Sequence, residues 1–258
     1  MTALLLDVRG LTRAFGGLIA ANNVDLTVGA REVVGLIGPN GAGKTTVFNM
    51  IAGSMTPTAG TVRFMGEDCT GDPAHRMAQR GVARTFQITS LFPTLTVAEN
   101  VAVGTHRRKR SGWGGSILRL PRFRREEAEV RAKVAEVLEF LGMARQSEMI
   151  AQTLPYGDQR KLEIAIALAA EPALLLLDEP AAGMNPDEAK RLTAMIGRIR
   201  DTGVSVLLVE HHMRVVMGIC DRIVVLNQGI KIAEGPPAAV ANDPTVIGVY
   251  LGREAARA

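Results

Sequence analysis

Alternation of apolar and polar residues predicts short strands in the first quarter of the chain. Residues 24–28 and 61–65 alternate as half-buried strands do, whereas residues 32–37 are apolar almost throughout and run into a glycine-rich turn. A helix is predicted over residues 44–52, and Gly53 ends it. This part of the chain is therefore expected to be rich in strands.

A helical pattern follows in the middle of the chain, and buried strands return in the last third. Residues 126–141 place valine and leucine on one face of a helix, and residues 162–170 are expected to form a further apolar helix. Residues 107–122, which precede them, are rich in glycine, serine and arginine and are expected to be irregular. Residues 173–177 and 204–209 are mostly apolar, which is typical of parallel strands covered on both faces.

Composition and charge narrow the classes of function. Aromatic residues make up only 4% of the 258 residues, which argues against a protein that stacks on nucleic-acid bases. The net charge of +4 arises locally, because residues 106–125 contain eight Lys or Arg and no Asp or Glu. This stretch fits a solvated loop, or a patch facing anionic lipid or an acidic partner, better than a nucleic-acid surface. The two cysteines, Cys69 and Cys220, lack metal-ligand spacing and are expected to be reduced thiols.

Residues 38–46 match the phosphate-binding pattern G-x-x-x-x-G-K-[ST] in full. The context fits, since a predicted buried strand precedes the loop and a predicted helix follows it. Glycines allow successive backbone N–H groups to face phosphate oxygens, and the start of the helix adds its positive dipole end. Lys44 is expected against the β- and γ-phosphates, and Thr45 on Mg²⁺. The residues of this loop that are expected to bind ATP are Gly38, Pro39, Asn40, Gly41, Ala42, Gly43, Lys44, Thr45 and Thr46.

Two further buried strands end in polar residues. Asp178 and Glu179 follow the strand predicted at residues 173–177, and His211 follows the strand predicted at residues 204–209. Ligand sites form at the carboxyl ends of parallel strands, so these side chains are expected at the same rim as the phosphate-binding loop. Asp178 is expected to hold Mg²⁺ through water, Glu179 to orient or deprotonate the attacking water, and His211 to reach the γ-phosphate.

These residues, in this order, resemble the ATP-binding subunit of ABC transporters, and the resemblance extends over nearly the whole chain. It identifies residues 38–46 as the Walker A motif and residues 174–179 as the Walker B motif. It implies that Phe15 stacks on adenine and that His211 is the switch histidine. It also implies that Gln87 is the Q-loop glutamine, which senses the γ-phosphate as a catalytic residue and ligates Mg²⁺.

The resemblance implies an α/β fold, with a P-loop NTPase core, an antiparallel β subdomain and a helical subdomain. The core is expected to comprise residues 1–87 and 166–235, and the helical subdomain residues 88–165. A C-terminal helical extension is expected over residues 236–258. ATP binding is expected to close two such subunits head to tail, with Gln87 at the hinge between core and helical subdomain.

The family's signature loop, usually Leu-Ser-Gly-Gly-Gln, is altered in this chain. Pro155 replaces the serine that bonds the γ-phosphate across a dimer, and proline offers neither a hydroxyl nor an N–H group. Asn185 stands where Asp is usual, and the switch histidine is followed by His212 rather than Asp. The residues that the resemblance places on a partner's nucleotide are Pro155, Tyr156, Gly157 and Asp158.

These departures resemble the ATPase subunit of branched-chain (hydrophobic) amino acid importers. The resemblance implies two membrane-spanning permeases, a second ATPase subunit that is non-identical or a second copy of this chain, and indirectly a periplasmic or extracellular substrate-binding protein. It implies a peripheral position on the cytoplasmic face of the cell membrane and no nucleic-acid partner. The longest apolar stretch, residues 164–177, contains Glu171 and Pro172 and is too short to span a bilayer.

Three other interpretations are open. An ABC transporter for urea, amides or a lipid would use the same ATPase chemistry, because the ATPase subunit does not touch the substrate. A soluble ABC-type ATPase acting on ribosomes or DNA usually has two ATPase domains or a long coiled coil, and neither pattern is present. A small-molecule kinase needs a phosphate-binding loop but has no need of the ordered set Gln87, Asp178, Glu179 and His211.

Overall fold

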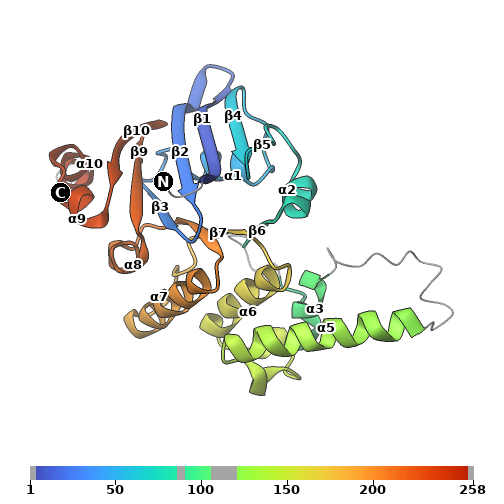
Figure 1. Cartoon of the computed structure of the whole chain (residues 1–258). Helices are drawn as coiled ribbons and strands as arrows, with labels where there is room; N and C mark the ends of the chain where they lie inside the picture. The colour runs from blue at the N-terminus through green and yellow to red at the C-terminus, as the bar shows by residue number, and fades with distance from the viewer. Residues whose placement is uncertain (1–3, 86–90, 106–120, 255–258) are drawn as a thin grey trace. The chain divides into compact units, whose positions relative to one another are not determined.

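The structure, a computed structural model, describes residues 4–85, 91–105 and 121–254. The chain divides into two compact units, and unit 1 comprises Met1–Arg84 together with Ala173–Ala258. Unit 2 comprises Thr85–Pro172, and the helical subdomain predicted for residues 88–165 falls inside it. Figure 1 shows that strands from the first and last parts of the chain join in one sheet of unit 1.

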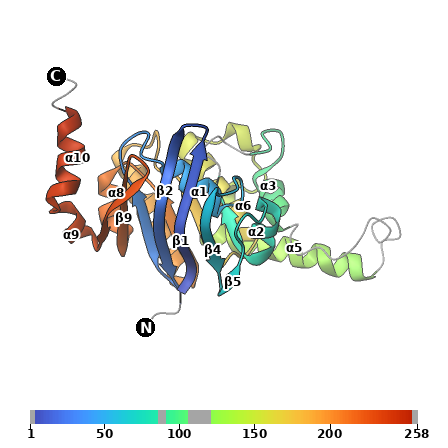
Figure 2. The same ribbon diagram turned by 90° about the horizontal axis from the view of Figure 1, so that it is seen from above.

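An antiparallel sheet forms much of the N-terminal part of unit 1 (Figure 2). In the order β2-β1-β4-β5, its described strands are β2 (Leu18–Gly29), β1 (Leu4–Phe15), β4 (Ala59–Phe64) and β5 (Glu67–Asp68). Leu6, Val8 and Leu11 of β1 are fully buried, while several of the residues between them are partly exposed. One face of this sheet therefore packs inward, and the other faces solvent.

A second sheet of unit 1 contains the buried strands, in the order β10-β9-β3-β8-β7-β6 within the described part of the chain. Its strands are β10 (Ile230–Gly235), β9 (Arg222–Asn227), β3 (Val33–Ile37), β8 (Ser205–Val209), β7 (Leu174–Asp178) and β6 (Val82–Arg84). Neighbours from β9 to β6 are parallel, and β10 runs antiparallel to β9. Every residue of β3, β7 and β8 is buried, which explains why these segments are so uniformly apolar.

Helix α1 links the two sheets of unit 1. The helices of this unit are α1 (Lys44–Ile51), α2 (Ala74–Arg80), α7 (Pro186–Asp201), α8 (Met213–Ile219), α9 (Pro237–Ala241) and α10 (Pro244–Glu254). Val47, Phe48 and Ile51 of α1 belong to one buried apolar cluster that also contains residues of both sheets. Close packing on both sides fixes the start of α1, and with it the end of the loop that precedes the helix.

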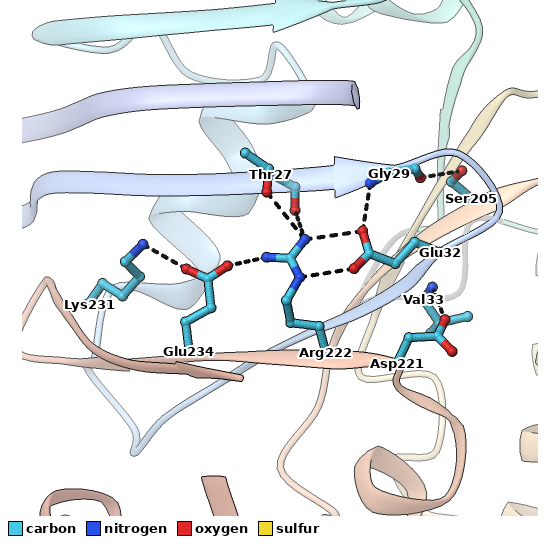
Figure 3. A network of polar contacts seen from close by, with 9 residues as sticks. All are labelled: Thr27, Gly29, Glu32, Val33, Ser205, Asp221, Arg222, Lys231 and Glu234. Atoms are coloured by element: carbon cyan, nitrogen blue, oxygen red, sulfur yellow. Dashed lines mark hydrogen bonds and ion pairs between the residues drawn. The ribbon is translucent and has the colours of Figure 1, made fainter. Parts of the chain in front are cut away.

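A polar network joins the two sheets near the starts of β3, β8 and β9 (Figure 3). Arg222 donates to both carboxylate oxygens of Glu32, at 2.9 and 3.1 Å, and to the Thr27 carbonyl oxygen at 2.8 Å. It also pairs with Glu234, which accepts from Lys231 at 2.8 Å. Burial by itself raises the pKa of Glu234, but the hydrogen bonds from Lys231 and Arg222 outweigh it, and the net pKa is lowered. The network braces the sheets at the edge opposite to the carboxyl ends of the parallel strands.

Unit 2 is mainly helical in its described residues. Its elements are α3 (Val97–Gly104), α5 (Pro121–Phe140), α6 (Tyr156–Ala169) and short 3-10 turns at Ala144–Gln146 and Ala151–Thr153. A capping box between Thr96 and Glu99 begins α3. The buried Asn100 side chain bonds both the N–H and the carbonyl of Phe92, so it fixes the segment that leads into α3.

The predicted fold class is confirmed, since a parallel-sheet core, an antiparallel sheet and a helical unit are all present. The helix predicted over residues 162–170 begins earlier, at Tyr156, with Pro155 in an extended conformation at its N-cap. Residues 107–120 of the stretch predicted to be irregular lie outside the described residues, and residues 121 and 122 belong to α5. No helix in residues 4–85, 91–105 and 121–254 combines the length and apolarity that crossing a membrane requires.

Both cysteines are buried and unpaired, in agreement with the prediction of reduced thiols. Burial raises the pKa of the Cys69 thiol to about 11 and that of the Cys220 thiol to about 12. A thiol with such a pKa is protonated at neutral pH, and only the thiolate is a good nucleophile. Neither cysteine therefore has the properties of a reactive site.

Candidate nucleotide-binding site

The carboxyl ends of β3, β7 and β8 lie side by side in the parallel sheet of unit 1. Leu36 of β3 and Asp178 of β7 both pair with Val209 of β8. The phosphate-binding loop follows β3, Glu179 follows β7, and His211 lies two residues after β8. The sheet therefore brings three segments that are far apart in the sequence to one edge, where ligand sites form in such folds.

Two glycines of the phosphate-binding loop, residues 38–46, have surroundings that exclude a side chain. Gly38 has a φ of +149°, and a Cβ at this position would lie 2.1 Å from the Leu226 carbonyl oxygen. Gly43 has a φ of +93°, and its Cβ would lie 2.2 Å from the Ala20 carbonyl oxygen. The loop thus passes so close to β9 and β2 that only glycine fits at these two points.

Lys44 begins α1, and its side chain folds back over the loop. Its Nζ donates to the carbonyl oxygens of Gly38, at 2.7 Å, and Pro39, at 3.1 Å, and the residue is only 7% exposed. Gly43 occupies the N-cap of α1, so no side chain caps the first turn. An ammonium group and the N–H groups of a helix start are therefore close together, and both attract phosphate oxygens.

Asp178 ends β7 in a buried position and has a cationic neighbour on β6. Arg84 places a guanidinium nitrogen 3.3 Å from Asp178 Oδ2, and it also donates to the side chain of Asn49 in α1 at 2.7 Å. Burial raises the pKa of the Asp178 carboxyl, and the positive charges of Arg84 and Lys44 oppose this rise. Arg84 thereby connects the end of β7 to the helix that follows the phosphate-binding loop.

Glu179 has a backbone conformation that is rare for a residue with a side chain, with a φ of +47°. Its N–H donates to the Val209 carbonyl at 2.8 Å, and its own carbonyl accepts the Ala182 N–H at 3.1 Å. Glu179 Oε1 lies 3.6 Å from His211 Nδ1, and both side chains are partly exposed. Strained conformations of this kind gather at functional sites, where the surrounding structure holds them in place.

A buried carboxylate, that of Glu210, joins the turns that follow β7 and β8. Its Oε1 accepts the Ala181 N–H at 2.9 Å, and its Oε2 accepts the N–H groups of His211 and His212 at 2.9 and 3.0 Å. The His212 ring lies 4.2 Å from the His211 ring, and its Nδ1 lies 3.1 Å from the same Oε2. Glu210 therefore contacts both of the segments that present the predicted catalytic side chains.

Three further residues predicted to contact the nucleotide, Phe15, Asn40 and Thr45, lie in unit 1. Phe15, at the end of β1, is 44% exposed, and the Arg13 guanidinium carbon lies 4.7 Å from the centre of its ring. Asn40 and Thr45 are exposed, at the tip of the loop and in the first turn of α1. Gln87, predicted as a catalytic and Mg²⁺-ligating residue, lies outside the described residues.

The residues predicted to meet a partner's nucleotide lie in unit 2, at the start of α6. Pro155 is the N-cap and provides no side-chain hydrogen bond to the helix. Tyr156 is 44% exposed, and its hydroxyl accepts from Arg160 Nε at 3.0 Å. Asp158 accepts from Gln146 Nε2 at 2.9 Å. The start of α6 is thus fixed by side-chain contacts, while the Tyr156 ring stays accessible.

Two residues outside the predicted set, Arg84 and Glu210, contact the predicted site residues directly. Arg84 stands three residues before Gln87 in the sequence, and no local signal distinguishes it from a surface arginine. Glu210 stands directly before His211, and a charged residue at the end of an apolar strand was the one available signal. Only the order of strands in the sheet shows which partners these two side chains have.

Comparison with known families shows where this chain belongs. Residues 21–182 match the family described as ABC transporter, and residues 231–256 match that described as branched-chain amino acid ATP-binding cassette transporter. The high-affinity branched-chain amino acid transport ATP-binding protein LivG of Salmonella typhimurium is 47% identical over 98% of this chain and 99% of its own length. The corresponding protein BraF of Pseudomonas aeruginosa is 46% identical over the same shares.

Solved structures have the same fold. The ADP conformation of MJ1267, an ATP-binding cassette of an ABC transporter, matches with a TM-score of 0.86 and 30% identity, over 97% of this chain and all of that one. A nucleotide-free ATP-binding cassette from an ABC transporter matches with a TM-score of 0.84 and 29% identity, over 96% and 99%. Together with the phosphate-binding loop and the acidic ends of the buried strands, these matches place the chain in the ABC transporter family, as an ATP-binding and ATP-hydrolysing subunit.

Proposed function

We propose that this chain energises an importer of branched-chain or other hydrophobic amino acids. The observation that carries the proposal is the identity of 46–47% along 98% of the chain with LivG and BraF, whose names describe high-affinity branched-chain amino acid transport. The match of residues 231–256 supports it separately, because this C-terminal segment lies outside the part that matches the general ABC transporter family.

The phosphate-binding loop holds the triphosphate of ATP. Lys44 exchanges its contacts with the Gly38 and Pro39 carbonyls for the β- and γ-phosphates, which are stronger partners of an ammonium group. The hydroxyl of Thr45 and the buried carboxylate of Asp178 are hard oxygen ligands of the kind that Mg²⁺ prefers, so the residues fit this ion. When bound, Mg²⁺ neutralises part of the phosphate charge.

Glu179 and His211 carry the hydrolytic step. Glu179 orients the attacking water and accepts its proton, and the distance of 3.6 Å to His211 keeps the imidazole within reach of the same reacting groups. Gln87 would sense the γ-phosphate and help to ligate Mg²⁺. Phe15 stacks on the adenine ring with its exposed face.

A second ATPase subunit completes the site. The dimeric, post-hydrolysis structure of the cassette MJ0796 bound to ADP and phosphate, 25% identical to this chain, supports a dimer. Pro155, Tyr156, Gly157 and Asp158 face the partner's nucleotide, but Pro155 has no hydroxyl for the γ-phosphate. In a heterodimer, this chain therefore supplies a complete phosphate-binding loop to one site and a weakened signature to the other.

The chain works on the cytoplasmic face of the cell membrane, attached to partners rather than inserted itself. Two permease subunits span the membrane, and a substrate-binding protein outside the membrane delivers the amino acid. Unit 2 carries the permease-docking surface. This arrangement couples ATP-driven closure of the two ATPase subunits to transport by the permeases.

The test is reconstitution of the chain in proteoliposomes with its permeases, its partner ATPase subunit and its binding protein. We expect ATP hydrolysis to rise when leucine, isoleucine or valine is added with the binding protein. Stimulation by urea, an amide or a lipid, with none by any hydrophobic amino acid, would contradict the substrate class. The 36% identity with the lipopolysaccharide export ATP-binding protein LptB of Haemophilus influenzae makes a lipid the necessary negative control.

A further inference from the structure

We propose that Glu210 is a positioning residue for ATP hydrolysis, which holds the turn of Glu179 and the turn of His211 in a fixed relation. The inference rests on the hydrolytic roles proposed for those two side chains. Glu210 is fully buried. It therefore acts on the two catalytic side chains through the backbone N–H groups that it binds.

One side chain bridges the two turns. Glu210 Oε1 accepts the N–H of Ala181 at 2.9 Å, two residues after Glu179. Glu210 Oε2 accepts the N–H groups of His211 and His212, at 2.9 and 3.0 Å. The length of one glutamate therefore sets the separation between the backbone that presents the catalytic carboxylate and the backbone that presents the imidazole.

The partners of Glu210 explain why the bridge needs a carboxylate. All three backbone partners are donors, and a carboxylate accepts at both oxygens. The amide of glutamine has one oxygen, so its NH₂ group would face a backbone N–H in a buried place. Glu179 adds a second requirement, because its φ of +47° persists only where the surrounding structure holds it.

A metal site is the competing explanation of this cluster. Glu210, His211 and His212 each offer a ligand atom, and these atoms lie within 4.8 Å of one another. However, the Glu210 oxygen beside both imidazoles already accepts two backbone N–H groups, so its lone pairs are engaged in the turn. Hydrogen bonding accounts for the whole arrangement.

Two substitutions break the bridge in different ways. Glu210→Gln keeps its length but replaces an acceptor with a donor. Glu210→Asp keeps the charge and can still bond the N–H groups of residues 211 and 212, but it is too short to reach Ala181. Both variants are made in the full-length chain and assembled with its partner subunits. Nucleotide affinity is measured with a fluorescent ATP analogue, and kcat and KM are measured by phosphate release.

We expect kcat to fall roughly 10- to 100-fold in both variants, while KM for ATP and nucleotide affinity stay within about twofold. Amide hydrogen exchange over residues 179–184 is expected to become faster in both, because the Ala181 N–H loses its acceptor. A substitution that only destabilised the fold would not separate kcat from nucleotide affinity in this way.

Glu234→Gln, in the network around Arg222, is the matched control and is expected to leave kcat unchanged. A kcat within about twofold of the parent in the Glu210 variants, or an equal loss in Glu234→Gln, overturns the proposal. If Glu210→Gln does not fold, Glu210→Asp decides alone. A parent complex that does not hydrolyse ATP would contradict the proposed hydrolytic roles instead, so the two failures are distinguishable.

Discussion

The guanidinium group of Arg84 lies 3.3 Å from the Oδ2 atom of Asp178, although the two residues are 94 positions apart in the chain. They meet because β6 and β7 are neighbours in the parallel sheet, where Arg84 pairs with Leu176. The Asp178 side chain is only 1% exposed and that of Arg84 14%, so this ion pair is shielded from solvent. The positive charge of Arg84 therefore compensates the buried carboxylate of Asp178 within unit 1.

Arg84→Ala is expected to lower the free energy of unfolding by about 3 kcal/mol, since it leaves the buried Asp178 carboxylate without this partner. Thermal denaturation followed by circular dichroism measures the change. Arg76→Ala is the matched control, because the Arg76 side chain is 64% exposed in its ion pair with Asp72 and its loss costs less than about 1 kcal/mol. Equal decreases in the free energy of unfolding in the two variants would show that the buried Arg84 pair stabilises the fold no more than an exposed pair does.

Glu179→Gln is expected to keep ATP binding and to lose roughly 10²- to 10⁴-fold in turnover, because glutamine cannot accept a proton from water. Phosphate release by the assembled complex measures turnover. Glu188→Gln is the control, since glutamine also serves in the capping box that Glu188 forms with Asn185 at the start of α7. Normal hydrolysis by Glu179→Gln would refute its assignment as the base.

Lys44→Ala is expected to abolish most nucleotide binding, because it removes the one ammonium group that lies over the Gly38 and Pro39 carbonyls in the described loop. Titration with a fluorescent ATP analogue measures the affinity. Lys190→Ala, on the exposed side of α7, removes the same charge and is expected to bind normally. Native affinity in Lys44→Ala would count against the proposed contact with the phosphates.

Glu234→Gln tests the network of Arg222 through its dependence on pH. Ion pairing lowers the pKa of Glu234 in the folded protein below its ordinary value of 4.5. The resulting stability is fully present above about pH 4.5 and is lost as pH falls through the folded pKa. The melting temperatures of parent and variant should therefore differ at pH 7 and converge in acid. A difference that stays constant down to pH 3 would contradict this account.

Pro155→Ser restores the usual signature serine at the start of α6. If this chain's signature serves a weakened site, the substitution is expected to change transport-coupled ATP hydrolysis by roughly two- to tenfold, the value of one hydrogen bond. Pro244→Ser, at the start of α10, is the control for a lost proline at a helix start. Coupled hydrolysis that stays unchanged within error in Pro155→Ser would remove the support for two unequal sites.

Local pattern was sufficient for much of this protein. The mostly apolar segments of β3, β7 and β8 predicted buried parallel strands, because a strand covered on both faces buries nearly all of its side chains. Residues 38–46 predicted a phosphate-binding loop, since its glycines and lysine have few other reasons to occur at that spacing. The helix α6 was also predicted, but its first residue was wrong. The helix begins at Tyr156, within the signature residues, and not at residue 162.

The partners of Arg84 and Glu210 could not be predicted in this way. Whether Arg84 faces Asp178, and whether Glu210 reaches Ala181, depends on which strands are neighbours and on the direction in which each turn leaves the sheet. Strand order is set by packing of the whole unit. The contacts of Arg84 with Asp178 and of Glu210 with Ala181 join residues 94 and 29 positions apart, and no local sequence pattern indicates them. The sequence by itself determined which chemical groups are present at the strand ends, and the tertiary structure decided how they are held, because only a folded sheet fixes those distances.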